Sequence, residues 1–200
     1  MDFPLHVAIL VFPDAEVLDF AGPFEVFSVA SRLVRGEQGL APFEVFLVSK
    51  DGGEVAARHG LRVTPRHSFA TVPRADLLIV PGGAVTEALA DDAVLEWIGQ
   101  AHRHTQITAS VCTGAFFLAK LGLLDGLAAT THWEDMEDLK AAAPLTELRS
   151  GVPYVEQGRI ITSGGISAGI EMSLYLVARL AGADLARRTA RQMEYRWDGP

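Results

Sequence analysis

Short apolar runs alternate with amphipathic segments along nearly the whole chain. Residues 5–12 form an almost continuous apolar run, which is typical of a strand buried on both faces. Comparable runs predict strands at 43–48, 76–80, 106–111, 128–131 and 152–162, the last a hairpin through Gln157-Gly158. Helical periodicity predicts helices at 22–33, 91–104, 114–121, 134–142, 166–180 and 184–195, the first with Pro23 in its opening turn. The polar, glycine-rich stretch 50–69 predicts a hairpin excursion.

This alternation predicts an α/β fold in which helices cover both faces of a mostly parallel central sheet. We expect a flavodoxin-like three-layer α/β/α sandwich that forms one domain over residues 1–200. Hydrophobic residues make up 49% of the sequence and charged residues 21%, a balance that supports a proper core and argues against a disordered chain.

The balance of charge narrows the range of partners. Seventeen Lys and Arg against 25 Asp and Glu give a formal net charge of −8, and the sequence has no basic cluster. Such a chain is a poor candidate for binding nucleic acid or anionic lipid. The first apolar run lacks a basic segment ahead of it, and no apolar stretch approaches the ~20 residues that cross a membrane. We therefore expect a cytoplasmic protein without membrane contact.

Cys112 is the single cysteine of the sequence, which excludes an internal disulfide and a multi-cysteine metal site. It lies between an expected strand and an expected helix, with the small residues Ser110 and Gly114 two positions to either side. A nucleophile elbow needs small residues there because the turn is tight. The helix that follows would favour a thiolate, so we expect the pKa of Cys112 to fall below about 8.5. The alternative is a buried cysteine that packs as a small hydrophobe.

Two other segments are candidates to complete a site around Cys112. Pro81-Gly82-Gly83 ends the strand expected beside the Cys112 strand, and Gly83 without a Cβ would let a backbone N–H act as an oxyanion donor. Asp19 lies among apolar residues after the first strand. It is either an N-cap or, if desolvated beside the thiol, a carboxyl that keeps its proton and serves as a general acid–base. Glu16, three residues earlier, is a competing carboxylate.

Five motifs together resemble one family, and they extend over most of the chain. They are Leu18-Asp19-Phe20-Ala21-Gly22-Pro23, Pro81-Gly82-Gly83, Ser110-Val111-Cys112-Thr113-Gly114, Gly122-Leu123-Leu124-Asp125-Gly126 and Ala129-Thr130-Thr131-His132-Trp133. This combination is similar to the ThiJ/PfpI superfamily, which has the class I glutamine amidotransferase-like fold. Within it, Thr162-Ser163-Gly164-Gly165-Ile166 resembles the Thr-x-Gly-Gly-Ile stretch of the bacterial isocyanide hydratases.

The resemblance implies a reaction and a set of residues. Cys112 corresponds to the nucleophile, Asp19 to its paired carboxylate, Thr113 to a residue that supplies an amide and a hydroxyl, and Ile166 to a residue that lines the pocket. It implies that a thiolate attacks the terminal carbon of an isocyanide and that water then releases an N-formamide, with a small-molecule substrate and neither metal nor cofactor. It also implies a homodimer.

Departures from the superfamily pattern leave other functions open. Many members have His directly after the nucleophile, and Thr113 at that position disfavours a protease or a Cys–His–Glu amidase. His132-Trp133-Glu134 imitates the amidotransferase His-x-Glu only 20 residues after the cysteine, and we expect His132 to be structural. A glyoxalase-like enzyme would need a reactive His. The histidine pair His102 and His104 points apart on a helix and predicts no metal site.

A non-enzymatic function is the other alternative. The ligand-sensing domains of AraC-type regulators carry similar Cys-Thr-Gly and Thr-Thr-His-Trp stretches. Those chains continue into a helix-turn-helix region, whereas this acidic sequence stops at Pro200. If the protein is not an enzyme, we therefore expect a free-standing sensor of a small molecule rather than a DNA-binding regulator.

Overall fold

The computed structural model describes residues 4–38 and 40–199, and it leaves the side chains of 36–38 undescribed. A seven-stranded sheet runs through the molecule in the order β10-β11-β7-β6-β1-β2-β5. Neighbouring strands are parallel except for β10, which is antiparallel to β11. The strands are β1 (Leu5–Leu10), β2 (Phe43–Ser49), β5 (His67–Ser68), β6 (Leu77–Val80), β7 (Ile107–Val111), β10 (Tyr154–Gln157) and β11 (Ile160–Ser163).

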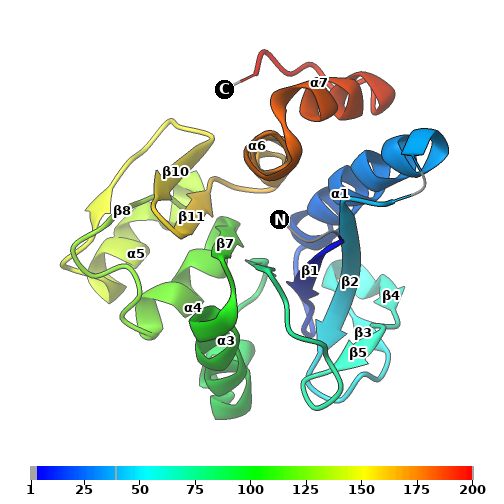
Figure 1. Cartoon of the computed structure of the whole chain (residues 1–200). Helices are drawn as coiled ribbons and strands as arrows, with labels where there is room; N and C mark the ends of the chain where they lie inside the picture. Colours follow the sequence, from blue (N-terminus) through cyan, green and yellow to red (C-terminus); the bar gives the residue numbers. More distant parts are fainter. Residues whose placement is uncertain (1–3, 39, 200) are drawn as a thin grey trace.

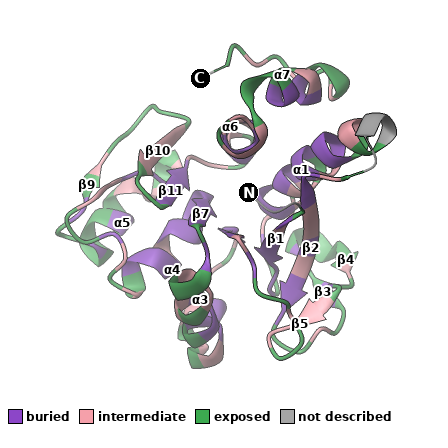
Figure 2. Cartoon of the chain, viewed as in Figure 1, coloured by how far each residue is buried: buried purple, intermediate pink, exposed green. Residues whose placement is uncertain are grey.

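Helices cover both faces of this sheet, which confirms the expected α/β/α sandwich. Figure 1 shows α1 (Val17–Gln38), α6 (Ala168–Ala181) and α7 (Ala183–Gln192) together on one face. On the other face lie α3 (Asp92–His104), α4 (Ala115–Lys120) and α5 (Met136–Ala142), with the short α2 (Thr86–Ala90) leading into α3. Figure 2 shows that buried residues dominate the central strands, such as β1 and β7, and the inward sides of the helices, while the edge strands β5 and β10 carry intermediate and exposed residues.

The first helix begins earlier than expected. It starts at Val17, so Pro23 lies inside α1 rather than in its opening turn. Proline lacks the N–H that would bond to the carbonyl four residues before it, which is the carbonyl of Asp19. Burial offsets this lost bond, because Phe20 and Phe27 on the same helix are 3% and 0% exposed.

The polar stretch after β2 forms the expected hairpin and also supplies an edge strand. β3 (Val55–Ala56) and β4 (Arg62–Val63) are antiparallel and enclose the 3₁₀ turn η1 (Arg58–Gly60). The next residues form β5, which pairs with β2 at the edge of the central sheet. The strand expected at 128–131 is shorter: β8 (Ala128–Ala129) pairs with β9 (Glu147–Leu148) and stays outside the central sheet.

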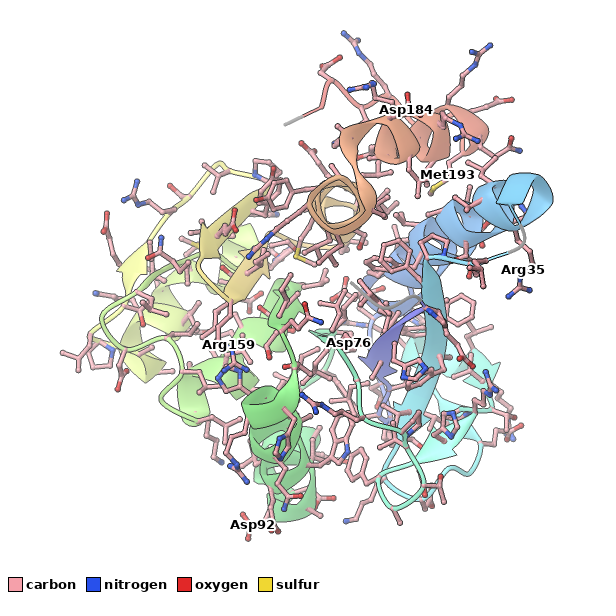
Figure 3. The ribbon with its side chains drawn as sticks, viewed as in Figure 1. Arg35, Asp76, Asp92, Arg159, Asp184 and Met193 are labelled. Carbon is pink, nitrogen blue, oxygen red and sulfur yellow. The ribbon has the colours of Figure 1, made fainter. Side chains whose placement is uncertain are left out.

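Polar side chains tie together the amino ends of the central strands. Asp76 accepts a hydrogen bond from the His6 N–H (2.9 Å), and Arg159 donates to the carbonyls of His102 and Thr105 at the end of α3 (Figure 3). His102 is held further by the Thr108 hydroxyl (2.9 Å). These bonds are internal to the fold, and they leave the carboxyl ends of the strands as the edge where a ligand would bind. Among the described residues, no helix has the length and apolar character needed to cross a membrane.

Candidate active site around Cys112

Cys112 sits on a strained turn at the carboxyl end of β7. The chain passes from Val111 directly into the 3₁₀ turn η2 (Cys112–Gly114) and then into α4. The φ of Cys112 is +57°, a left-handed conformation that few residues other than glycine adopt. The Cys112 N–H donates to the Gly164 carbonyl (3.2 Å), and the Cys112 carbonyl accepts from the Thr131 hydroxyl (2.8 Å). These two bonds over-determine the strained backbone, an arrangement typical of functional sites.

The small residue expected after the cysteine is required by the geometry. A Cβ on Gly114 would lie 2.1 Å from the carbonyl oxygen of Val80. The backbone at the end of β6 therefore lies directly against η2, and this close approach is possible only without a side chain at Gly114. Ser110, on the other side of Cys112, is fully buried, and its hydroxyl has no hydrogen-bond partner in the part of the chain that the structure describes.

Asp19 lies beside Cys112 in the first turn of α1, where it is completely buried. Because α1 begins at Val17, Asp19 lies inside the helix and is not its N-cap. Its Oδ2 accepts a hydrogen bond from the Gly82 N–H (2.9 Å). Its Oδ1 is also buried and has no hydrogen-bond partner among the described residues. The Cys112 thiol interacts with this carboxyl without reaching the geometry of a formed hydrogen bond.

Burial controls the proton affinity of both groups. The pKa of Asp19 is raised to about 7, chiefly by burial and also by the Glu16 charge, while the hydrogen bond from Gly82 lowers it in part. Burial likewise raises the pKa of the Cys112 thiol to about 12, with the Asp19 charge adding to the effect. The expectation of a lowered thiol pKa is wrong, because desolvation outweighs the N–H groups of Thr113 and Ile166 directed at the sulfur. The two groups titrate as a pair that releases its first proton near pH 7.

The Gly83 peptide groups are hydrogen-bonded to Thr113, so they are not free to bind a ligand. The Thr113 hydroxyl accepts from the Gly83 N–H (2.9 Å) and donates back to the Gly83 carbonyl (3.1 Å). The oxyanion donor expected at Gly83 is therefore already occupied, and the Thr113 hydroxyl serves the loop rather than the sulfur. The turn does lie against the Cys112 segment, as expected, since a Cβ on Gly82 would lie 2.5 Å from Thr113 Oγ1.

Ile166 reaches the site mainly through its backbone. It follows β11, has a left-handed φ of +50°, and directs its N–H at the Cys112 sulfur. Its side chain is 39% exposed, so it borders the mouth of the site. The structure therefore brings Cys112, Asp19, Thr113 and Ile166 together as the sequence predicts, with the amides of Thr113 and Ile166 as the donors to sulfur.

His132 is closer to the site than the sequence analysis expects. Its ring packs against Gly165, where a Cβ would lie 2.0 Å from His132 Cδ2, and Gly165 directly precedes Ile166. The ring Nδ1 lies 3.2 Å from Asp135 Oδ2 and 3.8 Å from Glu134 Oε2. Asp135 is therefore the nearer carboxylate, while the Glu134 N–H donates to the ring Nδ1 (3.4 Å). The His-x-Glu spacing thus contains a real contact of the ring, but folding brings a second carboxylate closer to it.

A cavity of about 230 Å³ is lined by the segments that hold the Cys112 backbone. Its lining includes Thr131 and Gly164, the two residues that hold the Cys112 peptide groups, together with Trp133, Met136 and Val152. Its apolar wall suits an uncharged organic group. In the described part of the chain, no group of three His, Cys, Asp or Glu side chains is arranged to hold a metal ion.

Fold and site together define an α/β protein built around one buried cysteine and one buried carboxyl. The chain belongs to the DJ-1/PfpI family, whose model matches residues 5–179. It is 34% identical to an isonitrile hydratase of Pseudomonas putida over 96% of this chain and 78% of that protein.

Other relatives widen the range of functions in the family. The chain is 30% identical to the HTH-type transcriptional regulator CdhR of Pseudomonas aeruginosa over 92% of its own length, but it spans only 53% of that regulator. Among solved structures, a THiJ/PfpI family protein from Pseudomonas syringae superposes with a TM-score of 0.84. That protein is 28% identical, and the match covers 98% of this chain and 77% of the other.

Proposed function

We propose that this protein hydrates isocyanides to N-substituted formamides, with Cys112 as the nucleophile and Asp19 as the acid–base group. The observation that carries the proposal is the fully buried Asp19 carboxyl beside the thiol, with a pKa raised by burial to about 7. A general acid–base works best when its pKa lies near the operating pH. The similarity to an isonitrile hydratase over 96% of the chain supports the same substrate class.

The proposed reaction needs only these two groups and one water molecule. The Cys112 sulfur adds to the terminal carbon of the isocyanide, and the proton held by the pair moves to that carbon, which gives a thioimidate. The oxygen of a water molecule then adds to the same carbon, while Asp19 takes a proton from that water and passes it to the nitrogen. The C–S bond of this adduct breaks, its hydroxyl group becomes the carbonyl of the formamide, and the hydroxyl proton returns to the Asp19–Cys112 pair. The sum is isocyanide plus water to formamide, with no oxidant or reductant.

The surroundings of the pair fit this sequence of steps. The amides of Thr113 and Ile166 stabilise negative charge on the sulfur when it leaves. Burial of Asp19 keeps bulk water from competing for its proton.

The test is turnover of an aryl isocyanide by the purified protein, with the formamide identified by mass spectrometry. Cys112→Ala should remove all enzymatic turnover. A parallel assay with a 2-oxoaldehyde tests the second candidate, a glyoxalase-like enzyme, which the His132–Asp135 pair favours. Loss of 2-oxoaldehyde turnover in His132→Ala, with no formamide from the wild type, would replace the first proposal by the second. No turnover of either substrate would favour the sensor function suggested by the regulator relative.

We also propose that the protein is a homodimer. Leu18, which adjoins Asp19 in the chain, and Ile166, whose N–H is directed at Cys112, are 36% and 39% exposed although both are apolar. A second copy of the chain would cover such a surface. Light scattering coupled to size-exclusion chromatography should give twice the 21.5 kDa of the chain, and a monomer would contradict this proposal.

A further inference from the structure

An ion pair between Glu16 and Arg58 lies directly before the helix turn that carries Asp19. The Arg58 Nη1 is 3.3 Å from Glu16 Oε2, and the two side chains are 47% and 23% exposed. Glu16 is the alternative to Asp19 as the acid–base carboxylate. The structure shows it paired with a cation of the hairpin, whereas Asp19 is the carboxyl beside the thiol.

The backbone of Arg58 also forms a hydrogen bond with residues 14–16, the segment directly before α1. The Arg58 N–H donates to the Ala15 carbonyl (3.0 Å), and the Asp14 N–H donates to the Ala56 carbonyl in β3 (3.0 Å). On its other side, the segment bonds to the loop after β6, since the Glu16 N–H donates to the Gly82 carbonyl (2.9 Å). The hairpin, residues 14–16 and the Gly82 loop are thus joined in one backbone network.

This network ends at the reacting groups. The Asp19 N–H donates to the Glu16 carbonyl (3.1 Å), and the Asp19 side chain accepts from the Gly82 N–H (2.9 Å). Asp19 is therefore attached both to the segment that Arg58 holds and to the loop against which that segment packs. Two charged groups act on the carboxyl: Glu16 raises the pKa of Asp19, and Arg58 lowers it.

We propose that Arg58 is a positioning residue of the Cys112 site, which neutralises Glu16 and thereby tunes proton transfer at Asp19. An uncompensated Glu16 carboxylate would oppose ionisation of Asp19 through like-charge repulsion, and the Arg58 guanidinium cancels part of this effect. On the thiol side, the nearby titratable groups are Asp135, whose charge raises the pKa of Cys112, and its partner His132. Arg58 acts on the Asp19 side of the pair, both directly and by pairing with Glu16.

This inference deepens the proposed function, but its test does not depend on isocyanide turnover. The rate at which iodoacetamide alkylates Cys112 reports the protonation of the Asp19–Cys112 pair whatever the substrate is. Measured from pH 5 to about pH 9, the rate should rise through a midpoint near pH 7 in the wild type. Failure of turnover with an intact alkylation profile would reject the proposed reaction and leave the role of Arg58 standing.

The decisive variants are Arg58→Gln, Glu16→Gln and the two combined. Arg58→Gln removes the compensating cation, so the midpoint should move to higher pH by roughly half to one pH unit. Glu16→Gln should move it to lower pH. The double variant should return towards the wild-type midpoint, because both charges are gone. A purely structural arginine would weaken the fold without this opposite pair of shifts.

Two controls keep the result interpretable. Arg58→Lys retains the charge and should retain the midpoint even if it loosens the hairpin. Arg62→Gln breaks the Arg62–Glu54 ion pair of the same hairpin (2.6 Å), which is exposed and faces no catalytic group, and should leave the midpoint unchanged. An unshifted midpoint in folded Arg58→Gln, or an equal shift in Arg62→Gln, would overturn the inference.

Discussion

The Asp19 side chain accepts a hydrogen bond from the Gly82 N–H at 2.9 Å, and this bond joins the start of α1 to the loop after β6. The two residues lie 63 positions apart in the sequence, and both adjoin the turn that carries Cys112. The bond orients a carboxyl that is otherwise wholly desolvated. One carboxylate oxygen is thereby fixed, and the other has no hydrogen-bond partner among the described residues.

The first prediction concerns the pH dependence of Cys112 reactivity. Because Asp19 and Cys112 share protons, alkylation should rise in two steps, one near pH 7 and one near pH 12. Asp19→Asn has no proton to share, so the step near pH 7 should vanish and only alkaline reactivity should remain. Rates of iodoacetamide labelling, followed by intact mass, measure both profiles. A step near pH 7 that survives in Asp19→Asn would show that another group controls the thiol.

The second prediction concerns stability. The pKa of Asp19 is raised from about 3.8 to about 7 on folding, so this group favours the folded state below pH 3.8 and loses that contribution as pH rises through 7. Above pH 7 its burial opposes folding by up to about 4 kcal/mol. Asp19→Asn should therefore be more stable than the wild type at pH 8, and the difference should shrink towards pH 4.

Urea unfolding at both pH values measures this difference. The exposed Glu87 of α2 gives a matched control, since Glu87→Gln removes a carboxylate that is not buried. Equal stability of Asp19→Asn and the wild type at pH 8 would mean that the carboxyl is not desolvated as described.

The third prediction separates the two carboxylates in catalysis. Asp19→Asn keeps the size of the side chain and can still accept from Gly82, but it cannot transfer a proton. Turnover of an isocyanide should fall by about 10²–10⁴-fold. Glu16→Gln should cost little at its optimum pH, because Glu16 is paired with Arg58.

Mass spectrometry of Asp19→Asn under turnover conditions should also show a thioimidate on Cys112, since water addition would be slowed. A nearly inactive Glu16→Gln beside an active Asp19→Asn would reverse the assignment.

The fourth prediction tests the tight turn after β7. Gly114→Ala places a methyl group 2.1 Å from the Val80 carbonyl oxygen, so β6 or η2 must move. We expect a loss of about 3 kcal/mol or more in the free energy of unfolding. Gly99→Ala in α3 is the matched control, because its nearest atom, Leu121 Cδ2, is 3.7 Å away. That variant should be neutral or more stable by up to about 1 kcal/mol, as expected for alanine in a helix. Thermal unfolding of both variants measures these changes, and equal stability of Gly114→Ala and Gly99→Ala would contradict the prediction.

The sequence by itself determined the sandwich fold and singled out Asp19 and Cys112, which the structure places side by side. Alternating apolar runs and helical periods are local properties, so the strand and helix order followed directly from them. The need for a small residue at Gly114 could also be predicted, because a tight turn restricts the size of residues close to it in the sequence. Even the first helix was found, although its start at Val17 was missed because packing of Phe20 and Phe27 outweighed the preference of Pro23 for an opening turn.

Only the tertiary structure decided how the pair titrates and what surrounds it. The pKa of Cys112 depends on how far folding removes the sulfur from water, and no local pattern encodes that desolvation. The occupation of Gly83 by Thr113, the pairing of His132 with Asp135, and the contact of Arg58 with Glu16 depend on side-chain geometry after folding. Two of these contacts join residues 30 and 42 positions apart, where the sequence holds no spacing rule that could have predicted them.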